Sequence, residues 1–130
     1  MLIINRYMTS KQENKVVGNM GENIANAYLQ KNGYVVLDRN WRCGNYEIDI
    51  ICIDNKQIVF VEVKTHNYNP CFDLAKMVNK QKRRRIIFSA NKYIRYNRIC
   101  MNARFDVVEV VLNGGEFFSL NHVKNAFYSV

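Results

Sequence analysis

Three ionisable residues stand inside two otherwise apolar segments, where strands would be expected to bury their side chains. Asp49 lies within the segment Glu-Ile-Asp-Ile-Ile, and Glu62 and Lys64 lie within Val-Phe-Val-Glu-Val-Lys-Thr. Glu62 and Lys64 are two residues apart, so they point to the same face of a strand. Acids that hold a divalent cation beside a lysine are suited to the hydrolysis of a phosphodiester, and these three residues are therefore candidates for that chemistry.

Asp49 can join the other two residues only if the two segments form a hairpin in the right register. Residues 46–53 and 57–65 are rich in Ile, Val and Phe, as hairpin strands often are. If Asn55 and Lys56 form a two-residue turn, Asp49 lies directly opposite Glu62. A three-residue turn would send Asp49 to the other face unless a bulge intervenes. The site hypothesis therefore predicts an even loop or a bulge.

Two carboxylates at cross-strand distance repel each other, and a divalent cation between them removes that repulsion. Mg²⁺ takes one or two carboxylates and keeps several waters, so Asp49 and Glu62 could hold Mg²⁺ or Mn²⁺. Lys64 could then orient a water or stabilise charge that develops on the phosphate. The alternative is a surface ion pair on a half-exposed sheet, worth about 0–1 kcal/mol. Spacing alone leaves both interpretations open.

The elements that must position these residues follow from hydrophobic periodicity and from turn signals. A helix is expected at residues 11–32, with Glu22 beside its apolar stripe, and a second long helix is expected within residues 73–97, begun by the basic residues at 80–85. Strands are expected at 34–37, 46–53, 57–65 and 104–112, with a short edge strand at 117–120. Residues 38–45 are expected to form an irregular bridge, and the last ten residues a short helix or an ordered tail. This order predicts an α/β fold with one mixed central sheet flanked by helices.

Composition limits the class of protein. The chain has 130 residues, of which 48% are hydrophobic and 23% charged, so we expect a single domain over 1–130, with 1–10 as a flexible N-terminal segment. No apolar run approaches the roughly 20 residues of a membrane span. The initial apolar stretch is too short for a signal peptide. We therefore expect a cytoplasmic protein that does not enter a membrane.

Charge is concentrated in one short segment. The net charge is +8, and residues 80–85 contain five of the basic side chains, Lys80, Lys82, Arg83, Arg84 and Arg85. A local basic patch suits a polyanion such as nucleic acid. A solvated basic helix face is the alternative. Lys82 and Arg85 are three residues apart and share a side of the predicted helix, whereas Arg83 and Arg84 diverge from it.

The motifs, taken in order, resemble the YraN family, whose fold is described as endonuclease-like. The resemblance covers about residues 18–127 and is carried by these segments: Gly21-Glu22, Gly33-Tyr34, Glu47-Ile48-Asp49, Phe60-Val61-Glu62-Val63-Lys64-Thr65, Lys82, Arg104-Phe105-Asp106 and Asn125-Ala126-Phe127. That family is similar in fold to the PD-(D/E)XK nucleases and to archaeal-type Holliday junction resolvases. The resemblance implies a restriction-endonuclease-like three-layer sandwich and a nuclease that acts on DNA, including structured or branched DNA.

The resemblance also implies roles for individual residues. Asp49 matches the first metal-binding acid, Glu62 the second acid and Lys64 the lysine of the motif. Glu22 matches a helix acid that helps to hold metal or water. The peptide carbonyl of Val63 would be a further ligand of Mg²⁺ or Mn²⁺. Lys82 is expected to point toward the acids.

The chain departs from the family pattern at two positions near these acids. Tyr46 stands where the family usually has glycine, and its ring would crowd the site or stack on a base. His66 stands where the family often has arginine, and it would contact phosphate or remain solvated. The bridge before Asp49 also lacks the serine of the resolvases, which removes an argument for junction specificity.

The predicted nucleic-acid contacts are Lys82, Arg83, Arg85, Arg42, His66 and Tyr46. Trp41 is expected to pack in the core rather than stack on a base. Arg104 and Asp106 are expected to form a structural ion pair at the sheet edge. Many nucleases of this fold cut two strands as dimers, so a homodimer is compatible with the prediction. A nucleic-acid-binding protein of the same fold without catalysis is the main alternative, followed by a scaffold protein.

Overall fold

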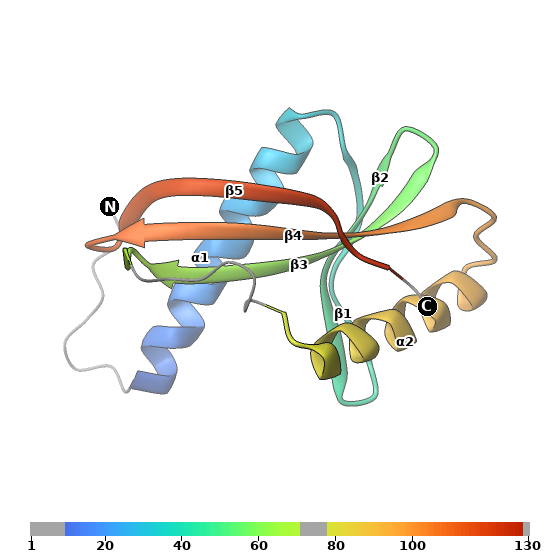
Figure 1. Ribbon diagram of the computed structural model, residues 1–130, viewed down its shortest axis with the longest axis horizontal. Helices are drawn as coiled ribbons and strands as arrows, with labels where there is room; N and C mark the ends of the chain where they lie inside the picture. The colour runs from blue at the N-terminus through green and yellow to red at the C-terminus, as the bar shows by residue number, and fades with distance from the viewer. Residues whose placement is uncertain (1–9, 71–77, 129–130) are drawn as a thin grey trace.

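The computed structural model describes residues 10–70 and 78–128 of the chain. Five strands form one mixed sheet in the order β1-β2-β3-β4-β5, in which β3 and β4 are parallel and the other neighbours antiparallel. Figure 1 shows the arrangement of the elements, which are α1 (Ser10–Lys31), β1 (Val35–Cys43), β2 (Tyr46–Asp54), β3 (Gln57–Asn67), α2 (Lys80–Tyr96), β4 (Asn102–Asn113) and β5 (Glu116–Phe127). The α/β class and the mixed sheet agree with the prediction.

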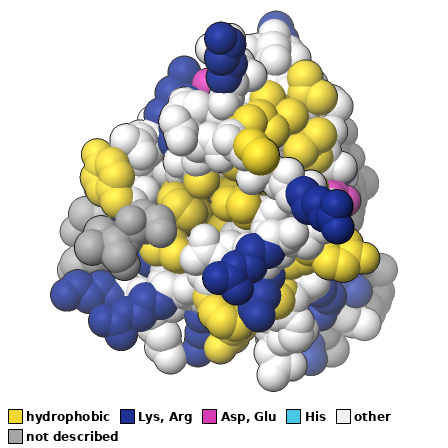
Figure 2. Space-filling model, turned by 90° about the vertical axis from the view of Figure 1, so that its right-hand side faces the viewer, with side chains coloured by type: hydrophobic (Ala, Val, Ile, Leu, Met, Phe, Trp, Pro, Cys, Tyr) yellow, Lys and Arg dark blue, Asp and Glu magenta, His cyan; other side chains and the backbone are white. Residues whose placement is uncertain are grey.

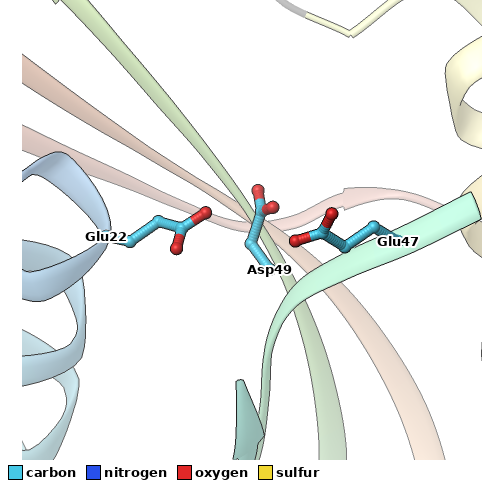
Figure 3. A group of neighbouring side chains, drawn as sticks. All are labelled: Glu22, Glu47 and Asp49. Carbon is cyan, nitrogen blue, oxygen red and sulfur yellow. The ribbon is translucent and has the colours of Figure 1, made fainter. Parts of the chain in front are cut away.

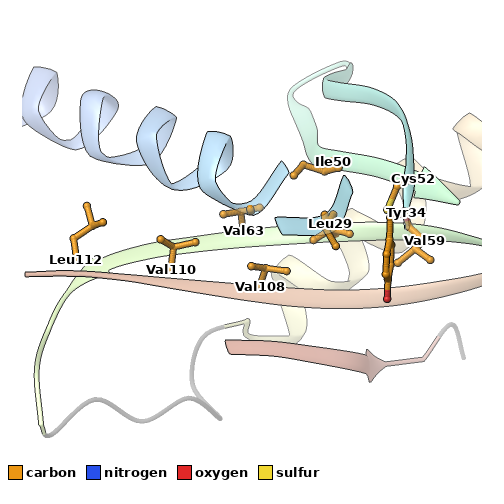
Figure 4. Packing of buried hydrophobic residues seen from close by; sticks show 11 residues of the cluster. Leu29, Tyr34, Ile50, Cys52, Val59, Val63, Val108, Val110 and Leu112 are labelled. Atoms are coloured by element: carbon orange, nitrogen blue, oxygen red, sulfur yellow. Dashed lines mark hydrogen bonds between the residues drawn. The ribbon is translucent and has the colours of Figure 1, made fainter. Parts of the chain in front are cut away.

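The two helices cover opposite faces of the sheet because β3 is apolar on both sides. Val59, Val61 and Val63 pack beneath α1, in a cluster that includes Leu29 and is shown in Figure 4. Ile58 and Phe60 point the other way and pack with residues of α2. Successive side chains of a strand alternate between faces, and a continuous apolar run therefore marks a strand that is buried on both.

One glycine allows α1 to approach β3 closely. A Cβ atom at Gly21 would overlap the side chain of Thr65, whereas a Cβ at Gly18, one turn earlier, would meet nothing within 4 Å. At Gly21 the helix therefore lies in close contact with β3, which a larger side chain would not allow. The next residue, Glu22, is held beside the strands for the same reason.

The β2–β3 hairpin has the even loop that the site hypothesis requires. Asp54 pairs with Gln57 across Asn55 and Lys56, and the pairing ends at Ile50 and Val61. Beyond that point β2 continues to pair with β1 as far as Tyr46. The β1–β2 ribbon therefore leaves β3, and the sheet opens beside Asp49.

Two sequence predictions need correction. The first concerns residues 38–45, which are not an irregular bridge, because β1 continues to Cys43 after a bulge between Val36 and Asp38. The second helix, by contrast, agrees with the prediction: α2 lies within 73–97 and begins at Lys80, where Asn79 caps it by accepting a hydrogen bond from the Lys82 N–H. Residues 73–77 lie outside the described residues.

The second correction concerns the C-terminal region. The short strand at 117–120 and the expected short helix or tail are one long strand, β5, which extends to Phe127. Two irregularities in its pairing with β4 accommodate its irregular sequence pattern. The flexible segment predicted at 1–10 lies outside the described residues, except for Ser10, where α1 begins.

Neither helix of the described chain is long and apolar enough to cross a membrane.

Candidate active site

Three carboxylates from two elements meet where the sheet opens. Glu22 comes from α1, and Glu47 and Asp49 come from β2, with one carboxylate oxygen of each within 4.8 Å of the others. Figure 3 shows Glu22 and Glu47 approaching Asp49 from opposite sides. All three side chains are half-buried. Oxygen-only donor sets of this kind suit hard divalent cations such as Mg²⁺ and Mn²⁺.

Asp49 lies at the centre of this cluster and is held by the backbone of β3. Its Oδ2 accepts a 2.7 Å hydrogen bond from the Val63 N–H. Burial, together with the charges of Glu62 and Glu22, raises the pKa of Asp49 to about 8. Burial also raises the pKa of Glu22. Burial and mutual repulsion thus disfavour the ionised form of these carboxylates, and a bound cation would favour it.

The backbone of Val63 faces the same opening. In a strand the N–H and C=O of one residue point to the same side, as they do in an antiparallel hydrogen-bonded pair. Since the Val63 N–H points to Asp49, its carbonyl points toward the gap between β2 and β3 as well. The carbonyl that was expected to be a ligand is therefore oriented toward the carboxylates.

Glu62 belongs to a second group of charges. Its side chain is only 3% exposed. One oxygen, Oε1, lies 3.0 Å from Nζ of Lys82 and 3.5 Å from Nζ of Lys64. Burial alone would lower the pKa of Lys82, but the charge and hydrogen bond of Glu62 outweigh it, so the net pKa is raised. Lys82 thus points toward the acids, as expected, and Glu62 is ion-paired rather than part of the carboxylate cluster.

A cavity of about 200 Å³ gives access to the cluster. It is lined by Asn45, Tyr46, Glu47, Asp49, Lys82, Arg85 and Ile86. The guanidinium of Arg85 lies 5.6 Å from the centroid of the Tyr46 ring. The structure therefore brings three of the predicted nucleic-acid contacts, Tyr46, Lys82 and Arg85, to the same cavity as Asp49.

The other three predicted contacts do not line this cavity. Arg83 donates from Nε to the Val78 carbonyl at 2.9 Å, and its guanidinium lies over the Phe127 ring, so it packs against the end of β5. His66 follows Lys64 on the same face of β3, and its Nε2 lies 3.0 Å from Glu109. Arg42 is exposed, with Nη2 3.6 Å from Glu47.

Glu47 was missed by the reasoning from sequence. The available signal was its position two residues before Asp49, because residues two apart share a face of a strand. Trp41 packs against α2, with its ring 5.2 Å from that of Tyr93, as the core interpretation predicted.

The Arg104–Asp106 ion pair is present, but it does not lie at a sheet edge. β4 is internal, and Asp106 is 0% exposed. Its carboxylate accepts two hydrogen bonds from Arg104 at 2.9 Å, one from the Asn125 N–H and one that His122 Nε2 makes at 2.7 Å. Burial would raise the pKa of Asp106, but these partners outweigh it and lower the pKa. This buried network ties β5 to the α1 face of the sheet.

The described geometry lies almost wholly within a segment that a family model recognises. The model, described as "Uncharacterised protein family UPF0102", matches residues 21–110, which include every acid and lysine of the site. The chain belongs to this family. UPF0102 is the YraN family that the sequence motifs resemble.

Relatives from several bacteria agree with this assignment, and each is named a UPF0102 protein. One from Clostridium beijerinckii is 46% identical over 120 residues, covering 90% of this chain and 97% of the relative. One from Alkaliphilus oremlandii is 43% identical, covering 88% and 99%. One from Bacteroides thetaiotaomicron is 36% identical, covering 89% and 95%. These names state no activity, so function must be inferred from the site of this UPF0102 protein.

Proposed function

We propose that this UPF0102 protein is a metal-dependent nuclease of the PD-(D/E)XK type that hydrolyses phosphodiester bonds in DNA, including structured or branched DNA. The observation that carries the proposal is the convergence of Glu22, Glu47 and Asp49 at an opening of the sheet beside two lysines. An enzyme that acts on cellular DNA would work in the cytoplasm, where bacterial DNA lies. A homodimer would allow both strands of a duplex to be cut.

Glu22, Glu47 and Asp49 would hold Mg²⁺ or Mn²⁺, with the Val63 carbonyl as a further ligand. When bound, the cation would polarise the phosphate and activate a water for attack on phosphorus. The burial of Asp49 would favour binding of the cation, because carboxylates that are removed from water are stabilised strongly by an adjacent positive charge.

Lys64 and Lys82 would act on the phosphate. Both are half-exposed, and both contact the same buried oxygen of Glu62. A substrate phosphate would compete with Glu62 for these ammonium groups. Their positive charge would stabilise the negative charge that develops on the phosphate during the reaction. Glu62, released from one of its two lysines, would then be available as the second acid of the motif.

A second function is favoured by one specific observation. Glu62 is already compensated by Lys82 and Lys64, so this half of the site needs no cation. A nucleic-acid-binding protein without catalysis would have the same basic surface. It would bind DNA equally well in EDTA, and its affinity would fall steeply with salt.

The test is a cleavage assay on labelled linear, flapped, branched and single-stranded DNA, with Mg²⁺, with Mn²⁺ and with EDTA. Asp49→Ala and Lys64→Ala are compared with Glu116→Ala and Lys56→Ala, which remove the same charges at distant turns. We expect metal-dependent cutting by the parent and by both controls, and a loss of about 100-fold or more in the two site variants.

Two results would contradict the proposal. Equal cutting by Asp49→Ala and the parent would exclude the carboxylate cluster from the chemistry. No cutting of any substrate, together with salt-sensitive binding that survives EDTA, would support the binding protein instead.

A further inference from the structure

A row of exposed side chains runs along α2, away from the carboxylates. Arg85, Phe88, Lys92 and Tyr96 are spaced three, four and four residues apart, which places them on one side of a helix. Phe88 is 49% exposed and Tyr96 is 84% exposed. Exposed aromatic side chains in such a row are unusual for a surface that contacts only water.

Aromatic and basic groups alternate along this row and touch each other. Arg85 lies over the ring of Tyr46, Tyr46 packs edge-on against Phe88 at 5.9 Å, and Lys92 Nζ lies 5.4 Å from the Phe88 ring. We call Tyr46, Arg85, Phe88, Lys92 and Tyr96 the aromatic-basic strip. Its first two residues also line the cavity that holds Asp49.

The far end of the strip borders a second cavity. This cavity has a volume of about 420 Å³ and is lined by Trp41, Arg42, Cys43, Lys92, Arg95 and Tyr96. None of the described residues that line it is acidic, and α2 itself contains no acidic residue. Arg42 lies between the two cavities: it lines the second cavity, and its guanidinium pairs with Glu47, which lines the first. Figure 2 looks at the molecule from the side where α2 ends and shows basic and apolar side chains intermingled, with few acidic ones.

We infer that the aromatic-basic strip binds single-stranded DNA and leads it to the carboxylate cluster, so that the substrate is an unpaired strand, such as a flap or an overhang. The inference rests on the proposed nuclease function and names its substrate. Exposed rings stack on unpaired bases of any sequence, and interleaved cations contact the phosphates between them. A duplex presents mainly phosphates to a protein surface and would leave the rings without partners.

The dimensions of the strip agree with this substrate. Arg85 and Tyr96 are eleven residues apart, or about 16 Å along the helix axis. At about 3.4 Å per stacked nucleotide, that length accommodates about five bases. The second cavity, with Trp41 and Tyr96 among its walls and three basic side chains around it, has the chemistry to receive one base and its phosphate.

The test measures binding in EDTA, where no cutting occurs. The fluorescence anisotropy of a labelled oligothymidylate of about 20 nucleotides is compared with that of a duplex of equal length. Phe88→Ala and Tyr96→Ala are compared with Phe117→Ala, which removes a 54% exposed ring at the β4–β5 turn, far from α2 in Figure 1. Lys92→Gln is compared with Lys56→Gln at the β2–β3 turn.

We expect the parent to bind the single strand more tightly than the duplex. Phe88→Ala and Tyr96→Ala should each weaken single-strand binding about five-fold or more, and Phe117→Ala should leave it unchanged. Lys92→Gln should lower the slope of log K against log salt by about 0.7, the value for one phosphate contact on a single strand. Equal affinity for duplex and single strand, or unchanged binding by both ring variants, would overturn the inference.

The outcomes separate the two proposals. If the ring variants bind normally while the parent still cuts DNA with Mg²⁺, only the single-strand inference fails. If the ring variants weaken binding but no metal-dependent cutting occurs, only the proposed nuclease function fails.

Discussion

Replacing Asp49 by Asn is expected to make the metal-free protein more stable at neutral and alkaline pH. The carboxylate is buried beside Glu62 and Glu22, and these surroundings raise its pKa to about 8. Asparagine keeps an oxygen that can accept the Val63 N–H, but it carries no charge to desolvate. The variant therefore removes an electrostatic penalty without removing the hydrogen bond.

The magnitude follows from proton linkage. Below about pH 4, Asp49 is protonated in both the folded and the unfolded chain and costs nothing. Between about pH 5 and pH 8 the unfolded chain has lost this proton while the folded chain retains it. The free energy of unfolding of the parent therefore falls by about 1.4 kcal/mol per pH unit, or up to about 4 kcal/mol over that range. Above about pH 8 the penalty is constant.

The assay is thermal unfolding in EDTA at several values between about pH 5 and pH 8. Each kcal/mol shifts the melting temperature of a chain of this size by about 3–5 °C, so the advantage of Asp49→Asn should grow by about 10 °C toward pH 8. Glu116→Gln, an exposed acid on the β4–β5 turn, is the matched control and should follow the parent. A difference between Asp49→Asn and the parent that stays constant with pH would refute the reasoning, as would a less stable variant at pH 8.

Three further predictions concern the site and its supports. Mg²⁺ or Mn²⁺ should raise the melting temperature of the parent more at about pH 8 than at about pH 6, because a carboxylate must lose its proton to bind metal. An equal shift in melting temperature at both pH values, or any shift in Asp49→Asn, would contradict this. Asp106→Ala should lower the free energy of unfolding in urea by about 3–5 kcal/mol, because Arg104 loses one of its two carboxylate partners and both His122 and the Asn125 N–H lose their buried acceptor. A loss below about 1 kcal/mol would show that this network is unimportant. Gly18→Ala should stabilise α1 by up to about 1 kcal/mol, because alanine favours a helix and has room there. Gly21→Ala should destabilise the protein and weaken its response to Mg²⁺, because the added methyl group displaces the helix from β3. Equal effects of the two changes would contradict the close approach of α1 to β3 at Gly21.

Strands with strong local patterns could be predicted from sequence. The apolar runs at 46–53 and 57–65 identified β2 and β3, but the short polar segment between them left the length of the turn open, and the pairing of Asp54 with Gln57 in the structure fixes it at two residues. β5 was underestimated because two irregularities in its pairing with β4 disturb the alternation of its side chains. β1 was shortened for a similar reason, since a bulge after Val36 shifts its pattern.

Some residues of the candidate site could likewise be predicted from the sequence, and others could not. Asp49, Glu62 and Lys64 could be found because each interrupts an apolar strand. Glu47 stands at the start of its strand rather than inside the apolar run, so its position two residues before Asp49 was the signal that could have been used, and its approach to Asp49 and Glu22 in the structure marks it as part of the site. The strip along α2 was recognised in part as a basic segment, but the aromatic residues that alternate with it become meaningful only beside Tyr46, which comes from another element.

The sequence by itself therefore determined the two strands of the hairpin and the shared face of Glu62 and Lys64, because these depend on an alternation that spans adjacent residues. It left open the length of the turn, and with it the register that turns Asp49 toward β3. Only the tertiary structure decided which charges share the site. Glu22 reaches Asp49 because Gly21 lets α1 lie close to Thr65, and Lys82 reaches Glu62 because α2 covers the opposite face. Such contacts join elements distant in sequence, and they depend on how whole faces pack rather than on any local pattern.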